Sequence, residues 1–304
     1  MSRCGLIRAT SPTRVADRPG DAGRVCALNR KLRLLGSSLI VVLLASAALA
    51  QQAPPTGYRS GVLSAHDHRV PVVPDRWPWS SLGRVNVILG VKRSFCTGTL
   101  IGPRHVITAA HCLFDGKTNG FVKPPAVHFV AAQDKDKFAA HAVAVAFATS
   151  PDFRFRVEER PRWDKIASDM VKNDWAIITL EQALPSAPVP IRAMPHANLP
   201  DDTRPDEIAL AGYGGDHAFV LSVHKGCTAR TDAPTAGHLL HTCDSMPGES
   251  GSPVLLLAGE EAWVIGIHVA VSADFTPQLG YRALAGHGAS ASTFEEAART
   301  ALGN

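Results

Sequence analysis

Short hydrophobic stretches separated by turn residues recur along this chain from residue 83 onward. They lie at residues 85–91, 99–101, 104–108, 126–131, 139–148, 176–180, 207–211, 219–223, 254–257 and 263–269. Many short stretches of this kind are typical of strands in an all-β barrel or sandwich. Prolines crowd residues 185–205, between two groups of these stretches, which favours a connection between two barrels.

The end of the chain has a different pattern, which predicts a helix at about residues 293–302. Ser292-Thr293-Phe294-Glu295 matches a capping box, in which a hydroxyl and a carboxylate bond to the first free N–H groups of a helix. Acidic side chains come early in this stretch and Arg299 comes late, as the helix dipole favours. We therefore expect a capped helix that begins at Glu295.

The first 50 residues have the pattern of an export signal. Residues 30–33 hold three basic side chains, and residues 34–50 are 17 uncharged residues that end in Ala48-Leu49-Ala50. This pattern is typical of a signal peptide that is removed after export. An uncleaved signal anchor is the alternative, since such a run reaches the low end for a membrane span. Both interpretations place the rest of the chain outside the cytoplasm, in a secreted or periplasmic protein. The cleaved signal peptide also predicts that the mature form is not attached to a membrane.

Residues 51–65 are rich in Gln, Pro, Gly and Ser, which predicts a flexible linker or a short pro-segment. Residues 66–304 form the predicted functional domain. The chain has a formal charge of +4, but residues 1–50 contribute +6 (eight Lys/Arg and two Asp/Glu) and the rest −2. The basic balance therefore gives no reason to expect nucleic acid as a partner.

His66-Asp67-His68 is the one short motif that suggests a metal. We favour a polar surface turn, because no Cys or third His follows at ligand spacing. The chain also has no His-Glu-x-x-His motif and no phosphate-binding loop. The sequence therefore predicts neither a metal nor an organic cofactor.

Residues 246–253, Met-Pro-Gly-Glu-Ser-Gly-Ser-Pro, place Ser250 in a glycine-flanked turn. Gly248 and Gly251 allow backbone conformations that a side chain would resist. Such a turn can hold a hydroxyl outward and aim backbone N–H groups at one point, which are the two needs of acyl transfer. Taken alone, the motif would fit a surface turn between two strands better.

Two upstream stretches favour the catalytic interpretation. Residues 106–112 run from an apolar strand into small residues and His111, and Asp174 opens a second apolar strand. A serine hydroxyl needs a base within reach, and the base needs a partner that fixes its tautomer. The order His111, Asp174, Ser250 is one known order of the serine triad, and it opposes the order of the α/β-hydrolases.

Together these stretches resemble the trypsin/chymotrypsin superfamily of serine proteases. The motifs are Thr-Ala-Ala-His-Cys at 108–112, an Asp before a hydrophobic strand, and Gly-Glu-Ser-Gly-Ser-Pro at 248–253. The Gly-Ser-Pro ending and Gly-Ile-His-Val at 266–269 are more similar to the bacterial glutamyl endopeptidase-like branch, as are residues 78–84 and 96–102. The resemblance covers about residues 66 to 302.

The resemblance implies two antiparallel six-stranded β-barrels, at about 66–185 and 206–290, with the active site between them. It implies an endopeptidase in which Ser250 attacks the peptide carbonyl, His111 is base and then acid, and Asp174 orients the histidine. The N–H groups of Gly248 and Ser250 would form the oxyanion hole. We expect a monomer that takes a protein or peptide substrate and requires no cofactor.

Two of the six cysteines fall within the first 50 residues. The other four are an even number, which predicts disulfide bonds in an exported chain, and four cysteines allow three pairings. The resemblance implies Cys96 with Cys112, which leaves Cys227 with Cys243.

Specificity depends on residues just before the nucleophile and on one later histidine. By the resemblance, Asp244 falls where trypsin keeps its pocket-floor aspartate, which would attract Arg or Lys. His268 matches the histidine that glutamyl endopeptidases use to receive a glutamate, and Ser245 matches the hydroxyl residue beside it. These signals conflict. The overall match favours the second, so we expect a slight preference for an acidic residue on the acyl side of the cut, with a structural His268 as the alternative.

Glu249 departs from the digestive enzymes, which carry Asp there to pair with a freshly cleaved N-terminus. The chain lacks the Ile-Val-Gly-Gly sequence that such activation uses. We therefore do not expect activation by that ion pair.

Several alternatives stay open. An exported esterase would use the same acyl chemistry, and a non-catalytic binding module could use the same fold. His111 could be a structural histidine. Asp164 or Asp169 could replace Asp174, although neither directly precedes an apolar strand.

Overall fold

The computed structural model describes residues 61–63, 66–154, 168–194, 208–231, 237–276 and 280–303. All of them belong to one compact unit, Gly57–Asn304. The predicted export signal and most of the predicted linker lie outside the described residues. Across the six described ranges, no helix combines the length and the apolar character needed to cross a membrane.

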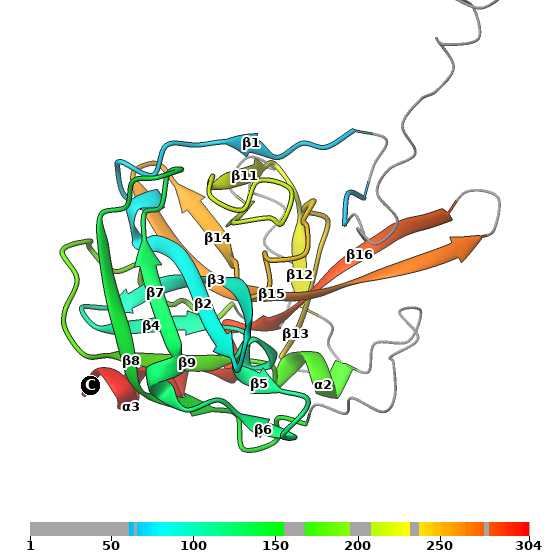
Figure 1. Ribbon diagram of the computed structural model, residues 1–304. Coiled ribbons are helices and arrows are strands. Elements are labelled where there is room, and N and C mark those ends of the chain that lie inside the picture. The colour runs from blue at the N-terminus through cyan, green and yellow to red at the C-terminus, as the bar shows by residue number, and fades with distance from the viewer. Residues whose placement is uncertain are drawn as a thin grey trace, which may run out of the picture. The chain divides into compact units, whose positions relative to one another are not determined.

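The first half of this unit is a closed barrel of six antiparallel strands (Figure 1). Alternation along the strands turns Val85, Val87 and Phe129 inward, where they are buried. Burying a side chain of this kind contributes about 1.5–3 kcal/mol. In order around the barrel, the strands are β2 (Leu82–Leu89), β3 (Lys92–Gly102), β4 (His105–Thr108), β9 (Ala176–Leu180), β8 (Ala140–Thr149) and β7 (Val127–Ala131).

The second half forms one eight-stranded sheet, where six strands were expected. Seven strands come from residues 208–290, and β1 (Val70–Pro71) joins from the N-terminal side by pairing with β11. Figure 1 shows β15 and β16 running side by side as a long ribbon. The expected all-β class with a six-stranded barrel is therefore confirmed. From β1 onward the sheet order continues β11 (Ser222–Lys225), β10 (Ile208–Gly212), β14 (Pro253–Ala258), β15 (Glu261–Thr276), β16 (Gly280–Ser290), β13 (His238–His241) and β12 (Ala229–Thr231).

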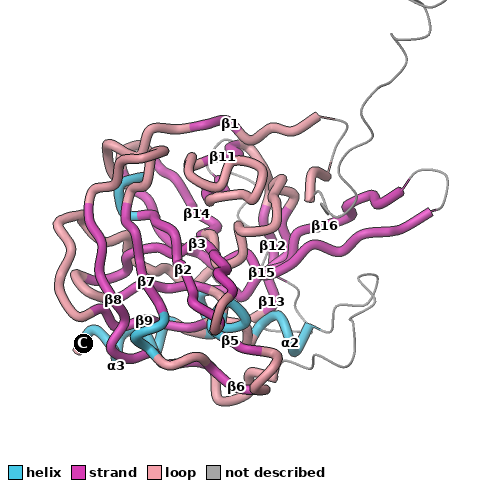
Figure 2. The backbone as a smooth tube through the Cα atoms, in the orientation of Figure 1, coloured by secondary structure: helices cyan, strands magenta, loops and turns pink. Residues whose placement is uncertain are grey.

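Helices are few and short in the described part of the chain, as Figure 2 shows. Strands β5 (Phe114–Asp115) and β6 (Gly120–Phe121) form a separate small hairpin beside the barrel. The remaining elements are η2 (Trp79–Ser81), η3 (Ala110–Leu113), η4 (Pro124–Ala126), α2 (Ser168–Lys172), η7 (Ala291–Thr293) and α3 (Glu295–Leu302).

The terminal helix α3 lies within its predicted range, but its predicted capping box is wrong. The N-cap residue is Phe294, and it makes no side-chain capping bond. Because η7 precedes the helix, the Thr293 hydroxyl donates back to the Ser290 carbonyl at 2.7 Å. Phe294 is fully buried and packs against Trp175, so hydrophobic burial fixes the start of the helix.

The described residues before β1 are held against the second half by hydrogen bonds. Gly61 exchanges two backbone bonds with Ser245, of 3.0 and 3.2 Å. After β1, the Val72 N–H donates to the Leu221 carbonyl at 2.8 Å. The flexible linker predicted at 51–65 therefore does not extend through Gly61–Leu63.

Candidate active site

His111 and Asp174 meet at one end of the closed barrel. His111 lies in η3 just after β4, and Asp174 lies two residues before β9, which pairs with β4. His111 Nδ1 is 2.7 Å from Asp174 Oδ2, and the His111 backbone N–H donates to Asp174 Oδ1 at 2.8 Å. One carboxylate therefore holds both the main chain and the ring of the histidine, which leaves Nε2 as the ring nitrogen for other chemistry.

Asp174 also controls the charge of His111. Burial by itself would lower the pKa of His111, but the charge and hydrogen bond of Asp174 outweigh it and raise the pKa above its usual value. Asp174 is only 6% exposed, and burying a carboxylate is costly unless it is paired and hydrogen-bonded. The pair is therefore mutually stabilising, with the histidine a stronger base than an isolated imidazole.

Ser250 lies in a turn that only glycine permits at two positions. Gly248 has a φ of 105° and Gly251 a φ of 80°, both in the left-handed region. A Cβ atom on Gly248 would lie 2.6 Å from the Phe95 ring, and one on Gly251 would lie 2.4 Å from the Thr97 carbonyl oxygen. Backbone conformation and lack of space therefore both explain the two glycines of the motif.

Thr97 of β3 ties this turn to the first barrel. The Thr97 N–H donates to the Ser250 carbonyl at 2.9 Å, and its hydroxyl donates to the Gly248 carbonyl at 3.2 Å. The N–H groups of Gly248 and Ser250 donate to no acceptor among the described residues, whereas those of the three neighbouring turn residues do. Two backbone donors beside the Ser250 hydroxyl are thus available to a ligand.

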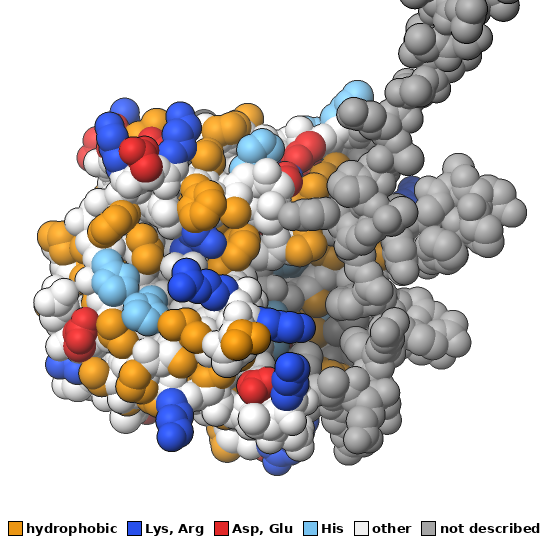
Figure 3. Space-filling view, viewed as in Figure 1, with side chains coloured by type: hydrophobic (Ala, Val, Ile, Leu, Met, Phe, Trp, Pro, Cys, Tyr) orange, Lys and Arg blue, Asp and Glu red, His pale blue; other side chains and the backbone are white. Residues whose placement is uncertain are grey.

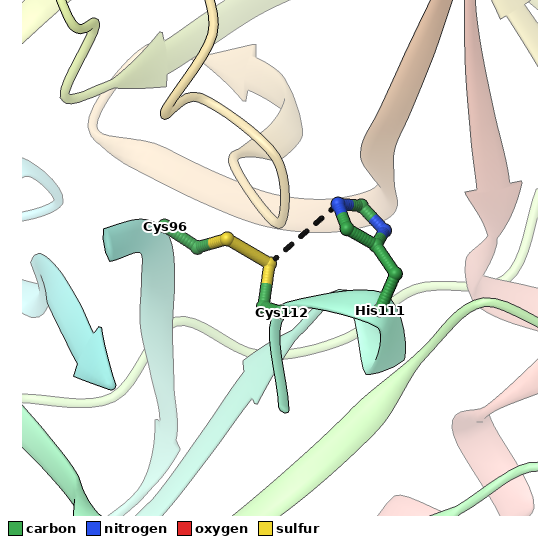
Figure 4. Close-up of side chains that lie close together, drawn as sticks. All are labelled: Cys96, His111 and Cys112. Carbon is green, nitrogen blue, oxygen red and sulfur yellow. Dashed lines mark hydrogen bonds between the residues drawn. A yellow bond between two sulfur atoms is a disulfide. The ribbon is translucent and has the colours of Figure 1, made fainter. Parts of the chain in front are cut away.

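The disulfide Cys96–Cys112 lies beside His111 (Figure 4). Cys112 Sγ is 3.8 Å from His111 Nε2 and 4.0 Å from the Ser250 carbonyl oxygen. A disulfide sulfur carries no hydrogen and cannot act as a thiolate, so these are packing contacts and the cluster is no metal site. The Nε2 edge of His111 and the main chain of Ser250 flank one sulfur atom.

A second disulfide joins Cys227 to Cys243, seven residues before Ser250. The first pair is the one that the resemblance implies, and the second is the pair that remained. Each connects segments that are separated by 16 positions. On the chain-entropy model, loops of this size stabilise a fold by about 3 kcal/mol each.

Glu249, directly before Ser250, pairs with Arg69 from the N-terminal segment. Arg69 Nη1 donates to Glu249 Oε1 at 3.2 Å, and the two side chains are 4% and 1% exposed. Nη2 of the same guanidinium donates to Asp216 at 2.6 Å and to Asp67 at 2.7 Å. Burial opposes the charge of Arg69, but the three acids outweigh it and raise its pKa. Burial also raises the pKa of Glu249 to about 7, against the influence of Arg69.

Asp244 accepts hydrogen bonds from the N-terminal segment. It is 1% exposed, and its oxygens accept bonds from the Leu63 N–H at 2.8 Å and the His68 N–H at 2.9 Å. His68 Nδ1 lies 2.9 Å from the same carboxylate. The carboxylate therefore already has three donors.

A second group of possible metal ligands is formed by His68, His224 and Asp244. Their side-chain ligand atoms lie within 4.8 Å of one another, although His68 is distant in sequence from the other two. The Asp244 N–H donates to His224 Nδ1 at 2.8 Å, and His68 Nδ1 bonds to the Asp244 carboxylate. A metal would have to displace these bonds to reach the same nitrogen atoms. The arrangement is therefore better explained by hydrogen bonds that hold the N-terminal segment in place than by a metal site.

His268 lies beside the serine turn, and the hydrogen-bond pattern fixes its tautomer. The Gly251 N–H donates to the His268 carbonyl at 2.7 Å. The Cys243 N–H donates to His241 Nδ1 at 3.2 Å, so the His241 proton is on Nε2, which lies 2.9 Å from His268 Nδ1. That bond leaves the proton of neutral His268 on Nε2. Ser245 is 1% exposed and its hydroxyl has no partner among the described residues.

The buried histidines predict a loss of stability in acid. Desolvation lowers the pKa of His241 to about 3, so unfolding takes up a proton at any pH between about 3 and 6.5. Stability should therefore fall as pH decreases through this window, by about 1.4 kcal/mol per pH unit for each such histidine. Urea unfolding between pH 4 and 7 measures how the free energy of unfolding depends on pH. In His241→Gln this dependence should correspond to the uptake of about one proton fewer than in the wild type. The same change at exposed His66 is the control, and an unchanged slope in His241→Gln would contradict the assignment.

The structure also places residues that sequence reasoning missed. Thr97 lies within a motif that resembles the family, and that position was its one signal. Arg69 and His241 gave no signal, because their partners are distant in sequence. His68 gave a signal only as part of a possible metal motif, interpreted as a surface turn, and its bond to Asp244 was not predicted. Of the rival acids, Asp164 lies outside the described residues.

Comparison with known proteins places these features in a family. Residues 96–267, more than half of the chain, match the family described as trypsin-like peptidase domain. Serine protease 23 of Bos taurus is 31% identical over 201 residues, which cover 60% of this chain and 52% of that protein. The Mus musculus protein of the same name is 31% identical over 177 residues, covering 52% and 42%. The chain thus spans about half the length of these curated relatives.

Solved structures agree on the fold. The structure of a Glu endopeptidase has a TM-score of 0.57 at 20% identity, covering 80% of this chain and all of that one. Protease Anisep from Arthrobacter nicotinovorans has a TM-score of 0.51 at 17% identity, covering 76% and 99%. At these identities the likeness concerns the fold.

Proposed function

Because the chain belongs to the trypsin-like peptidase family, we propose that it is a serine endopeptidase that acts outside the cytoplasm through Ser250, His111 and Asp174. The observation that carries the proposal is the 2.7 Å contact between His111 Nδ1 and Asp174 Oδ2. The Ser250 main chain lies against the same sulfur atom as His111 Nε2.

In the proposed reaction, Ser250 Oγ attacks the peptide carbonyl carbon while His111 Nε2 takes the hydroxyl proton. The carbonyl oxygen gains negative charge and accepts bonds from the N–H groups of Gly248 and Ser250, whose loss costs about 2.7–4 kcal/mol per donor in comparable enzymes. His111 then gives the proton to the leaving amine, and the C–N bond breaks. A water molecule hydrolyses the acyl-enzyme by the same proton transfers in reverse. Apart from this water and the substrate, the proposed steps use only groups of the protein.

The same site could serve an exported esterase, because acyl transfer to water is common to both activities. Comparing kcat/KM for a peptide and for a simple ester with the same acyl part separates the two. A non-catalytic binding module is the third possibility. The presence of all three reactive side chains, with the His111–Asp174 bond formed, argues against it.

Export is supported by the disulfides Cys96–Cys112 and Cys227–Cys243, which persist in oxidising compartments. The basic and apolar pattern of residues 1–50 agrees with a secreted or periplasmic enzyme. We expect protein or peptide substrates and a monomeric enzyme.

For specificity, we propose an acidic residue on the acyl side of the cut. Asp244 is a poor receptor for Arg or Lys, because Leu63 and His68 already supply three donors to its carboxylate. His268 and Ser245 can both donate to an incoming carboxylate: His268 through Nε2–H and Ser245 through its hydroxyl.

The test uses peptides that differ only in Glu, Gln or Arg on the acyl side. The wild-type protein should prefer Glu, and His268→Val should lower kcat/KM for Glu by about 10- to 100-fold, the usual value of a hydrogen bond to a charged group. His128→Val, at a half-buried histidine of the first barrel, is the matched control. A wild-type preference for Arg that is lost in Asp244→Ser and untouched by His268→Val would contradict the proposal.

A further inference from the structure

Arg84 of β2 is a buried cation with few partners. The residue is 7% exposed, and its Nη1 donates to Gln133 Oε1 at the long distance of 3.4 Å. Its Nε is buried without a hydrogen-bond partner, and no carboxylate pairs with the guanidinium within the described ranges. Burial lowers the pKa of Arg84, but an arginine stays charged in a protein. A buried charge of this kind is costly unless something pairs with it.

Two aromatic rings compensate the charge in part. Arg84 Cζ lies 4.2 Å from the centre of the Phe95 ring and 4.4 Å from that of Phe219, which is 51% exposed. A ring face stabilises a cation but offers no acceptor in the plane of the guanidinium. The N–H groups of Arg84 that remain are therefore suited to a planar anion, which a guanidinium binds with two parallel hydrogen bonds.

This cluster lies next to the serine turn. Arg84 is the register partner of Thr97, whose hydroxyl donates to the Gly248 carbonyl. Phe95 is the ring that excludes any side chain from Gly248. His268 instead contacts the turn at Gly251. His268, which we propose to bind the acyl side of the substrate, and the Arg84 cluster therefore approach the turn at different points.

Figure 3 shows one face of the molecule, on which Lys and Arg side chains lie among hydrophobic ones. An anionic ligand is indicated by the guanidinium of Arg84 itself, whose N–H groups can pair with a carboxylate.

We propose that Arg84, with Phe95 and Phe219, binds a carboxylate of the substrate on the leaving-group side of the cut. The carboxylate belongs either to an acidic side chain or to the C-terminus of a short leaving peptide. This inference rests on the proposed function, because it takes the side of the site from the roles of Ser250 and Gly248.

The test compares peptides that share the same acyl part. They differ in the second residue after the cut, which is Asp, Asn or Lys, and each is made with a free and with an amidated C-terminus. Rates are normalised to a p-nitroanilide of the same acyl part, which has no residue on the leaving-group side. The wild type should favour Asp over Asn by about tenfold, as expected for a charge-assisted pair. Arg84→Met should abolish that ratio, and Arg84→Lys should retain part of it. Dependence on the free C-terminus alone would identify the terminal carboxylate as the ligand.

Arg192→Met is the control, since Arg192 also lies over a ring, that of Trp263, at 5.0 Å. Equilibrium binding of the amidated leaving peptides Ala-Asp-Ala and Ala-Asn-Ala to the same variants decides the question without turnover. Failure of the proposed function would abolish all hydrolysis but not this binding difference. Equal binding of the two amidated peptides by the wild type, with no gain in binding when the C-terminus is left free, would overturn the inference, and so would an Asp preference that survives in Arg84→Met. Thermal unfolding verifies that each variant is folded.

Discussion

Ser250→Ala is expected to lower kcat by about 10⁶-fold, as removal of the nucleophile does in comparable serine proteases. The turn around residue 250 is held by glycine conformations and by Thr97, and these contacts do not involve the hydroxyl. The variant should therefore fold normally. Single-turnover hydrolysis of a good peptide substrate, with thermal unfolding as a control for the fold, measures the effect. A fluorophosphonate that labels a serine other than Ser250 would contradict the assignment.

Asp174→Asn belongs to the same prediction and has a second readout. We expect a fall of about 10⁴-fold in kcat, because the amide favours the wrong tautomer of His111. Asp174 raises the pKa of His111, so removing its charge should lower that pKa. The acid limb of kcat/KM should accordingly move to lower pH in the variant, since His111 must be neutral to act as base. Asp152→Asn, at an exposed acid, should change neither quantity.

Periodicity predicted most of the barrel strands but not the whole second sheet. The strands of the closed barrel are rich in Val, Ile and Phe, which mark a buried β-strand by themselves. Strand β16 consists largely of Gly and Ala, so it has no run of large apolar residues to detect. It is a strand because β15 and β13 pair with it on both sides. Tertiary pairing of this kind leaves no local pattern in the sequence.

The candidate site divides in the same way. Short motifs pointed to His111, Asp174 and Ser250 as candidates, because each of the three lies in a local context that its backbone requires. The residues that hold these motifs came from elsewhere in the chain. Arg69 and Glu249 are 180 positions apart, and Thr97 and Gly248 are 151 apart. Only tertiary packing brings such pairs together.

Asp244 illustrates the limit most clearly. Its position suggested a pocket floor, but orientation of a carboxylate depends on which donors reach it. Leu63 and His68 reach it from a segment that composition had assigned in part to a linker or left as a surface turn. A low-complexity composition describes the average behaviour of a segment, whereas two or three backbone bonds decide whether it is ordered.

Arg69→Met should destabilise the protein by about 3–5 kcal/mol, the usual cost of leaving one partner of a buried ion pair alone. Arg69 and Glu249 are both almost fully buried, so water cannot replace the lost cation. Glu249 Oε2 also accepts the Met246 N–H at 2.8 Å, which ties the carboxylate to the serine turn. We therefore expect kcat to fall together with stability. Urea unfolding and peptide hydrolysis measure the two effects, and exposed Arg76→Met is the control.

The pH dependence of this variant distinguishes a buried carboxylate from lost packing. Burial already raises the pKa of Glu249 to about 7, and loss of Arg69 should raise it further. Between pH 4.5 and the folded-state pKa, the folded protein then binds a proton that the unfolded chain does not, so stability decreases as pH rises. The deficit of Arg69→Met should therefore be smaller at about pH 5 than at about pH 8. Adding Glu249→Gln should restore part of the stability at the higher pH, because the double variant buries no unpaired charge. A deficit that is equal at both pH values and unchanged in the double variant would mean that Arg69 acts through packing alone.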